Sequence, residues 1–274
     1  LIERYGTDAL RFALVREVAG AGQDIRLDYD RKKDTSATVE ASRNFANKLW
    51  NATRFALMNL GGETPAQLGD PDPAALQLAD RWILSRLSRV NRETAERYSS
   101  YGLGEAAKGL YEFAWNDVCD WYLELSKRRL NPGENPSAEA LADQRVAKQV
   151  LAKVISQMHL MLHPLMPHLT EELWHSVTGE PETSFLALQP WPELDESALD
   201  DALEASFAEL IGAIRVVRNL RAVAGLKPSQ SVPVRFVTGR GELAAVLNQG
   251  TADITALTRA ESAAVMAPAE AEAA

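Results

Sequence analysis

The sequence has a single cysteine, no long hydrophobic run and fewer basic than acidic residues. Because Cys119 is alone among 274 residues, no disulfide can form within the chain, and its apolar neighbours favour a small buried side chain. No segment approaches the roughly 18 apolar residues that a membrane-spanning helix requires. Together these absences predict a soluble globular protein of the cytoplasm that has no membrane partner.

Motifs of nucleotide and metal sites are also missing from the sequence. It contains no glycine-rich phosphate loop, no Cys-x-x-Cys pair and no His-Glu-x-x-His. The i,i+4 pair His159 and His163 could place two imidazoles on one zinc ion, but no third ligand has suitable spacing and Pro164 ends the helix. We therefore expect packed histidines, no metal, no cofactor and no catalytic residue in this chain.

The neighbouring carboxylates Glu171 and Glu172 could in principle act as an acid/base pair. Adjacent residues of a helix point in different directions, however. We expect Thr170 to cap a short helix, so that both carboxylates lie in its first turn and are stabilised by the helix dipole.

The net charge of −9 argues against a polyanionic partner, but the charges are unevenly distributed. Residues 210–241 include no acidic residue, and a helix predicted over 199–224 carries Arg215, Arg218 and Arg221 on one broad side. Val216, Val217, Leu220 and Ala224 lie on the other side. Two interpretations stay open here, a solvated basic face and a surface that contacts the backbone of RNA.

Periodicity predicts a mainly α protein, an antiparallel helix bundle with a small C-terminal α/β appendix. Four long segments carry the helical pattern of the bundle, at 37–60, 79–99, 103–129 and 138–162. Before them, a first helix at 1–18 runs into a loop at 19–22. A short helix follows at 168–177. Strand patterns occur at 231–238 and 256–266, with a helix at 242–249 between them.

These patterns divide the chain into four parts. We expect a connector over 1–36, a helical bundle over 37–190, an α/β subdomain over 191–266 and a frayed tail over 267–274.

One face of the helix predicted over 37–60 has an unusual composition. Asn44, Lys48, Asn51 and Phe55 fall on one line at about 100° per residue, and Arg54 lies at its edge. Proteins that read unpaired RNA bases combine an aromatic ring for stacking with amide or cationic donors for the base edges. The alternative is that Phe55 packs under a neighbouring helix.

Several segments carry a family resemblance. The stretches RNFANKLWNATRFALMNL, ADRWILSRL, EFAWNDVCDWYLELSKRRL and MLHPLMPHLTEELW, in this order, resemble the anticodon-binding region of valyl-tRNA synthetases, which are class I aminoacyl-tRNA synthetases. LIERYGTDALRF and AGQDI resemble the stem-contact segment that follows the catalytic domain in that family. The chain starts at Leu1 without methionine, and we expect it to be a piece of a longer protein.

This resemblance implies an RNA partner, valine tRNA, bound through its anticodon loop and stem. Valine anticodons carry A and C at their second and third positions, and the family positions that meet the splayed bases match Phe55 for stacking and Lys48 for donation. Asn44, Asn51, Arg43 and Arg54 are weaker candidates, the arginines for phosphates.

The resemblance also implies what lies outside the chain. Neither adenylation signature of class I synthetases is present, so valine activation with ATP and magnesium is expected in the parent protein and not here. The other expected partners are the catalytic and editing domains of a monomeric parent, a valine–tRNA ligase.

A rival hypothesis belongs to a different class. The aromatic-rich segment 103–129 could dock a protein partner, with no role in RNA binding.

Overall fold

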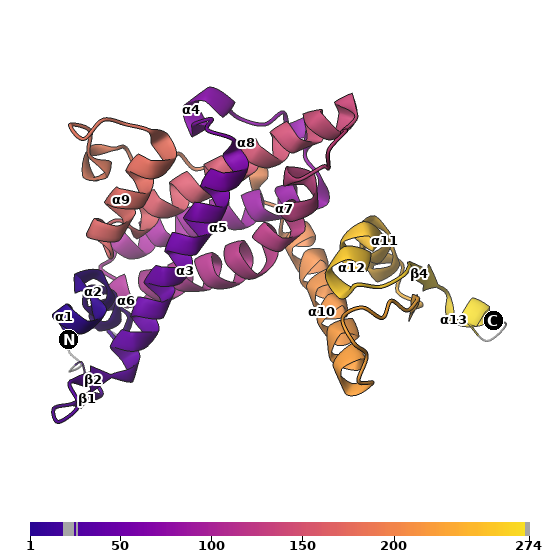
Figure 1. The fold of residues 1–274 in the computed structure, drawn as a ribbon, viewed down its shortest axis with the longest axis horizontal. Helices are drawn as coiled ribbons and strands as arrows, with labels where there is room; N and C mark the ends of the chain where they lie inside the picture. The colour runs from indigo at the N-terminus through magenta and orange to yellow at the C-terminus, as the bar shows by residue number, and fades with distance from the viewer. Residues whose placement is uncertain (19–24, 26, 272–274) are drawn as a thin grey trace. The chain divides into compact units, whose positions relative to one another are not determined.

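The computed structural model describes residues 1–18, 25 and 27–271, which form two compact units, Leu1–Leu199 (unit 1) and Asp200–Ala274 (unit 2) (Figure 1). The loop predicted at 19–22, most of AGQDI and the last three residues lie outside the described part. In unit 1 the elements are α1 (Ile2–Tyr5), α2 (Thr7–Arg16), β1 (Tyr29–Asp30), β2 (Thr35–Ser36), α3 (Ala37–Leu60), α4 (Pro65–Leu68), η1 (Pro73–Ala75), α5 (Leu78–Ser99), α6 (Leu103–Glu112), η2 (Phe113–Tyr122), α7 (Leu123–Leu130), α8 (Ala138–Leu162), α9 (Pro167–Thr178), η3 (Leu186–Leu188) and η4 (Glu196–Ala198).

Helix α3 has the predicted bounds because both of its ends are specified locally. The Ser36 hydroxyl accepts a hydrogen bond from the Val39 amide at the N-terminus. At the other end Gly61 takes a left-handed conformation with φ 69°, which a side chain would disfavour. The preceding hairpin of β1 and β2 pairs Tyr29 with Ser36, so the chain enters α3 from a fixed direction.

The first predicted helix is interrupted. Gly6, with φ 91°, separates α1 from α2, so the segment 1–18 forms two helices where one was expected. Helix α2 packs closely against the start of α6, because a Cβ on Gly104 would lie 2.0 Å from the Val18 carbonyl oxygen.

The segment predicted as one helix over 103–129 is helical without a break, but it changes from α-helix to π-helix and back. Between α6 and α7 the ten residues of η2 form a π-helix, in which each turn holds an extra residue. The Leu123 amide accordingly donates to the Val118 carbonyl, five residues back, and not four. Residues after η2 therefore face directions that α-helical counting does not give.

The antiparallel bundle of α3, α5, α6–η2–α7 and α8 encloses the core of unit 1, which confirms the predicted fold class (Figure 1). Phe113, Trp121 and Tyr122 of η2 are buried in this core. Tyr111 and Trp115 are half-buried and stack on each other, with ring centroids 5.5 Å apart. The aromatic residues of this segment thus pack mainly within the bundle, which leaves the rival hypothesis only the half-exposed rings of Tyr111 and Trp115 as a surface.

A buried charge network joins three bundle helices. Arg129 of α7 contacts Asp80 of α5 at 2.6 Å and Asp143 of α8 at 2.8 Å, and the Tyr122 hydroxyl donates to Asp80. Because Asp80 is fully buried, losing Arg129 would leave a buried carboxylate without its countercharge.

The start of α9 corrects a sequence prediction. The helix begins at Pro167, so Thr170 lies inside it and is not its N-cap, and Glu171 and Glu172 are not in the first turn. The Thr170 hydroxyl instead donates to the Met166 carbonyl. The Leu169 amide near the helix start donates to the carboxylate of Asp8 in α2, a partner distant in sequence.

The boundary between the units differs from the predicted one after Pro190. The segment that follows Pro190 stays with unit 1, because the indole of Trp191 donates to the side chain of buried Asn91 at 2.5 Å. Asn91 in turn donates to the Pro192 carbonyl at 2.9 Å.

Unit 2 is a small α/β structure, as predicted. Its elements are α10 (Asp201–Val223), β3 (Val234–Val237), α11 (Gly241–Gln249), α12 (Thr251–Thr258), β4 (Ala263–Met266) and α13 (Pro268–Ala271). Strands β3 and β4 are parallel, with Val234 opposite Ala263. Helix α12 occupies residues for which a strand was considered, and a short helical turn stands where a frayed tail was expected.

Among the described residues, no helix is both long enough and apolar enough to cross a membrane.

Candidate nucleic-acid interface

The face of α3 that carries Phe55 is open to solvent along much of its length. Asn44, Asn51 and Arg54 are exposed, whereas Lys48 and Phe55 are half-buried. The opposite side packs in the core through Phe45, Leu49, Ala52, Ala56 and Leu60, as the periodicity predicts. We call the line of Asn44, Lys48, Asn51 and Phe55 the α3 face.

Lys48 is held in place by residues of η2. Its ammonium lies 2.5 Å from a carboxylate oxygen of Asp120 and 3.9 Å from the centroid of the Trp115 ring. The side chain keeps 25% of its surface exposed. The amine is therefore reachable, but it is already paired, which the sequence analysis did not foresee.

The Phe55 ring has a cation above it. Lys127 of α7 places its ammonium 6.0 Å from the ring centroid, and the same ammonium contacts a carboxylate oxygen of Glu124 at 2.5 Å. The side-chain amide of Asn59 donates from Nδ2 to the Phe55 carbonyl at 2.7 Å. The α3 face is thus bordered by alternating charges from η2 and α7.

The two arginines at the edges of this face differ in their contacts. Arg43 lies over the Tyr5 ring at 5.5 Å and 3.9 Å from Glu40, so it is partly engaged within the protein. Arg54 is exposed, and within the described part of the chain it has no hydrogen bond or ion pair. Of the two, Arg54 is better placed to meet a phosphate.

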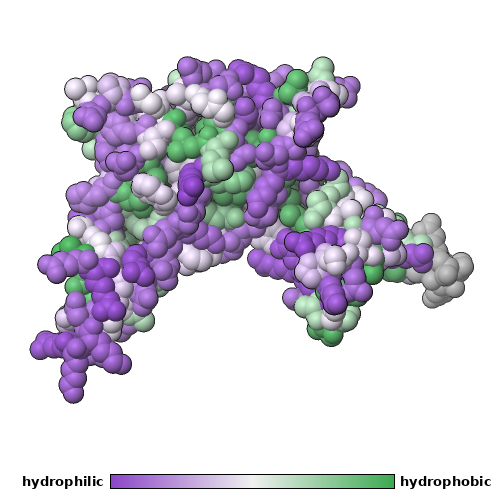
Figure 2. All heavy atoms as spheres, viewed as in Figure 1, coloured by the Kyte–Doolittle hydropathy of each residue, from purple (hydrophilic) through white to green (hydrophobic). Residues whose placement is uncertain are grey.

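Hydrophobic side chains appear on the same side of the molecule as α3 (Figure 2). Trp50, Leu57 and Met58 of this helix are exposed. Trp50 and Leu57 lie away from the α3 face, whereas Met58, seven residues after Asn51, lies beside it.

The three predicted arginines of α10 do not form one uniform basic face. The buried side of α10 is made by Phe207, Leu210, Ile214 and Val217, whereas Val216 and Leu220 are 55% and 62% exposed. The assumed apolar side opposite the arginines is therefore only partly buried. Arg218 and Arg221 line a cavity of about 310 Å³ together with Arg259 of the α12 terminus, and Arg215 is exposed outside that lining.

His159 and His163 have separate partners. The Nε2 atom of His159 lies 2.9 Å from the Thr53 hydroxyl in the core, and complete burial lowers the pKa of His159 from 6.5 to about 3. His163 contacts the Thr170 hydroxyl through Nδ1 at 2.8 Å, and burial lowers its pKa as well. In the described residues no three ligating side chains are grouped to hold a metal ion.

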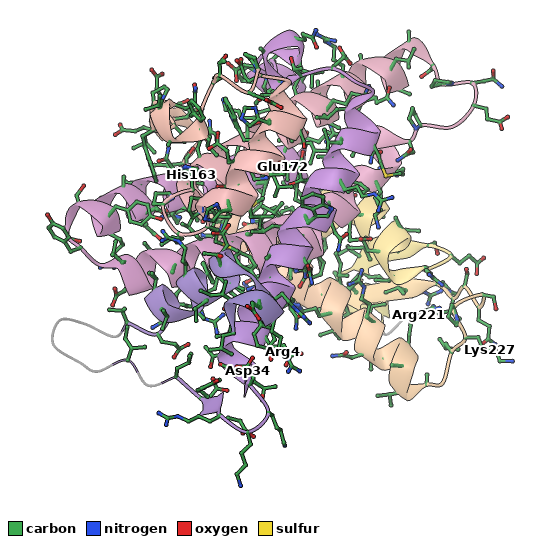
Figure 3. The ribbon with its side chains drawn as sticks, turned by 60° about the vertical axis from the view of Figure 1, so that its left-hand side comes forward. Arg4, Asp34, His163, Glu172, Arg221 and Lys227 are labelled. Carbon is green, nitrogen blue, oxygen red and sulfur yellow. The ribbon has the colours of Figure 1, made fainter. Side chains whose placement is uncertain are left out.

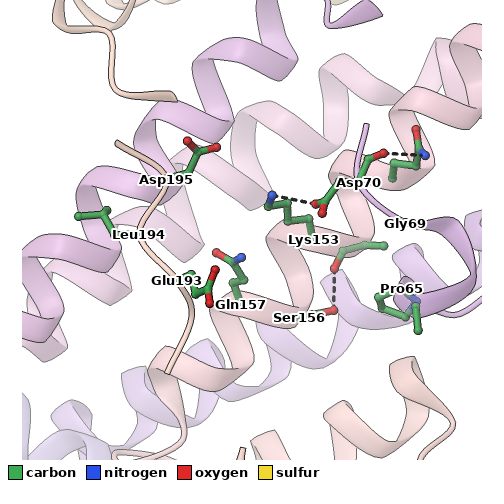
Figure 4. Close-up of a pocket in the computed structure, with 12 residues that line it drawn as sticks. Pro65, Gly69, Asp70, Lys153, Ser156, Gln157, Glu193, Leu194 and Asp195 are labelled. Atoms are coloured by element: carbon green, nitrogen blue, oxygen red, sulfur yellow. Dashed lines mark hydrogen bonds and ion pairs between the residues drawn. The ribbon is translucent and has the colours of Figure 1, made fainter. Parts of the chain in front are cut away.

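His163 and Glu172 belong to the α8–α9 corner of unit 1 (Figure 3). Between α4, α8 and residues 193–195 lies another hollow, of about 670 Å³ (Figure 4). Its lining holds three carboxylates, those of Asp70, Glu193 and Asp195, and one ammonium, that of Lys153, which pairs with Asp70 at 2.9 Å. Such a negative lining repels phosphates and does not suit RNA.

Residues 80–236, more than half of the chain, match the family model described as the anticodon-binding domain of tRNA ligase. The chain belongs to this family. The matched region includes α5 to β3 and the arginines of α10, whereas the α3 face precedes it.

Curated relatives extend the similarity to the full chain. The whole chain is 95% identical to a valine–tRNA ligase of Parasynechococcus marenigrum (strain WH8102), and 98% of it is 78% identical to the valine–tRNA ligase of Prochlorococcus marinus (strain MIT 9313). These relatives confirm the resemblance to valyl-tRNA synthetases. The chain spans 30% and 29% of their lengths, respectively.

A solved structure shows the same fold. It is the crystal structure of the ternary complex of Agrobacterium radiobacter K84 agnB2 LeuRS-tRNA-LeuAMS, with a TM-score of 0.50 and 15% sequence identity. The match covers 87% of this chain and 22% of that chain.

Proposed function

We propose that this chain reads the anticodon of valine tRNA and positions the tRNA for aminoacylation by catalytic and editing domains of a longer protein. Membership of the anticodon-binding family and the similarity of this whole chain to part of the valine–tRNA ligases support this role. The observation that carries it is the α3 face, where a half-buried ring and a positioned ammonium lie in one line with two exposed amides.

The chemistry of this face suits unpaired bases. A base can stack on the Phe55 ring if the Lys127 ammonium, 6.0 Å from the ring centroid, moves aside or covers the base from above. Asn44 and Asn51 each offer an amide donor and acceptor to base edges, and Lys48 offers donors once it turns from Asp120. Arg54 can contact a phosphate at the edge of the same face.

A binding assay with the complete chain tests this function. Fluorescence anisotropy would compare a labelled valine tRNA transcript with a transcript whose middle anticodon base is changed from A to G, at low and at raised salt. We expect tighter binding of the unchanged transcript at both salt concentrations, because base contacts distinguish sequences whereas phosphate contacts weaken with salt. Equal affinity for both transcripts would contradict base reading.

The remaining assignments concern the longer protein. Activation of valine with ATP and magnesium belongs to its catalytic domain, and we assign no cofactor to this chain. We further propose that the longer protein acts as a monomer in the cytoplasm.

A further inference from the structure

Unit 2 contains a cavity of about 310 Å³ whose polar lining is mostly guanidinium. It lies between the end of α10, the loop that follows and the end of α12, and three of its lining residues are Arg218, Arg221 and Arg259. The lining includes no acidic and no aromatic side chain. We infer that this cavity binds one phosphate group of the RNA backbone, an inference that rests on the proposed function.

Backbone carbonyls hold the three arginines in place. Arg218 donates from Nε to the Leu257 carbonyl at 3.0 Å, and Arg221 donates from Nη2 to the Gln230 carbonyl at 2.7 Å. Arg259 donates from Nη1 to the Pro228 carbonyl at 3.5 Å. A guanidinium has five N–H donors, so in Arg221 and Arg259 these carbonyl contacts fix the position of the group without using up all of its donors.

The charges of Arg221 and Arg259 are not neutralised. Neither side chain forms an ion pair with a carboxylate in the part of the chain that the structure describes. One nitrogen of Arg221, Nη1, is buried and has no hydrogen-bond partner there. Buried donors are almost always satisfied in native proteins, so this atom needs an acceptor such as an anion or a water molecule.

The backbone at Arg259 also indicates a functional constraint. Arg259 ends α12 in a left-handed conformation with φ 54°, a position that glycine or asparagine would occupy with less strain. Strained positions are concentrated at binding sites, where a particular side chain is required. Here the required group is a third guanidinium beside those of α10.

Phosphate is the ligand class that matches this lining. Its oxygens accept charge-assisted hydrogen bonds from several guanidinium groups at once, and arginine is the side chain best suited to such pairing. Because no aromatic residue lines the cavity, it offers no ring for a base. Arg221 extends from α10 near the loop that carries Lys227, a further cation at this end of unit 2 (Figure 3).

The inference is tested with Arg259→Gln in the complete chain, with Arg235→Gln as the matched control. Arg235 is an exposed arginine of β3 in the same unit, outside the cavity lining. Anisotropy with valine tRNA over a series of salt concentrations gives the slope of log K against log salt. We expect Arg259→Gln to reduce that slope by about 0.9, the value for one phosphate contact, which amounts to about a threefold change between 50 and 200 mM salt. Arg235→Gln should leave the slope unchanged.

An equal change of the salt slope in both variants would show diffuse electrostatic attraction and would overturn the proposed phosphate site. An unchanged slope in Arg259→Gln would overturn it as well. Titration with inorganic phosphate provides the second measurement, followed by NMR of the arginine Nε–H groups. Shifts at Arg221 and Arg259 but not at Arg235 are expected. Phosphate shifts without any effect of Arg259→Gln on RNA binding would mean that the cavity takes free phosphate only, and would overturn the RNA contact.

Failure of this inference can be told apart from failure of the proposed function. Discrimination between the two anticodon transcripts should persist in Arg259→Gln, because the cavity contacts phosphate and not bases. Loss of discrimination in the unmodified chain would defeat anticodon reading while the slope still reports the cavity.

Discussion

Phe55 and Lys48 differ in how ready they are to bind a nucleotide. The Phe55 ring is half-buried, and the ammonium of the long Lys127 side chain lies 6.0 Å from the ring centroid. Lys48 is paired with Asp120 at 2.5 Å, so contact with RNA must compete with that carboxylate. Phe55 thus offers its ring surface directly, whereas Lys48 must exchange the Asp120 carboxylate for an RNA group.

Replacing Phe55 by alanine should weaken binding of valine tRNA. Loss of one base stack corresponds to about 1–3 kcal/mol, or about a 5- to 150-fold increase in Kd. Anisotropy titration measures this change, with a thermal melt to check that the fold is kept. Leu57→Ala is the control, since Leu57 is exposed on α3 away from the α3 face. An equal loss in both variants would remove the special role of the ring.

Replacing Asp120 by asparagine should have the opposite effect. The substitution removes a negative charge beside Lys48 and frees its ammonium, so Kd should fall by about two- to fivefold at low salt, the size of an exposed ion pair. Asp70→Asn breaks the comparable pair with Lys153 in the acidic hollow and should not change the Kd. Weaker binding by Asp120→Asn would contradict this expectation and would mean that Asp120 positions Lys48 for the RNA or contacts the RNA itself.

At the level of single residues, the composition of the α3 face could be predicted because α3 is a regular helix with both ends specified. Its neighbours could not. Asp120 and Trp115 lie in a π-helix, where counting at 100° per residue misplaces side chains, and Lys127 follows it. Arg259 was missed because its position depends on a helix end that no sequence pattern indicated.

At the level of elements, α3 and α8 are joined through one polar contact in the core. The Thr53 hydroxyl meets His159 at 2.9 Å, and burial lowers the pKa of His159 from 6.5 to about 3. The unfolded chain therefore binds a proton between these two pH values that the folded chain does not bind, and stability falls as the pH decreases through that window.

His159→Gln should make unfolding less sensitive to acid. Between pH 7.5 and pH 5, protonation of His159 in the unfolded state should lower the free energy of unfolding by about 2 kcal/mol, and the variant should lack this decrease. Urea unfolding at both pH values measures the difference in the free energy of unfolding. His163 shares a lowered pKa, so His163→Gln is the comparison, with a smaller effect expected. An unchanged pH dependence in His159→Gln would show that the histidine is protonated in the folded state.

The helices themselves were largely predictable from apolar spacing and breakers. The bounds of α3 and α8 agree with the sequence prediction, because serine caps and glycine or proline breakers mark them. The predicted bounds of α9, 168–177, agree to within one residue with the observed helix, but Thr170 was wrong as its N-cap. The carboxylate that accepts from the Leu169 amide near the helix start belongs to Asp8, a residue 161 positions away that only the tertiary structure brings near.

On the scale of the whole molecule, the two units divide the proposed contacts. The α3 face belongs to unit 1, and the cavity of Arg218, Arg221 and Arg259 belongs to unit 2. The proposed base contacts therefore lie in unit 1, with Arg54 as a phosphate contact beside them, and one further phosphate contact is proposed for unit 2. This division could not be predicted, since the sequence placed the boundary before Trp191, whose contact with Asn91 holds that segment in unit 1.

A chain that ends at Leu199 should keep its preference for the unchanged anticodon transcript, because the α3 face and its borders are complete within unit 1. Its salt slope should be smaller by at least about 0.9, through loss of the proposed phosphate contact. Anisotropy with the two transcripts measures both quantities. Loss of the preference, in a shortened chain whose melt is cooperative, would place base reading outside unit 1.

The π-helix of residues 113–122 also sets a limit on how this protein can change in length. Each residue removed from a helical segment that keeps its helix type turns everything beyond it by about 100°. A one-residue deletion within η2 would carry Lys127 away from Phe55 and, in the same rotation, Arg129 away from Asp80. The border of the α3 face and the charge network of the core are thus tied to one residue count, and a length change here that keeps the π-helix would disturb both together.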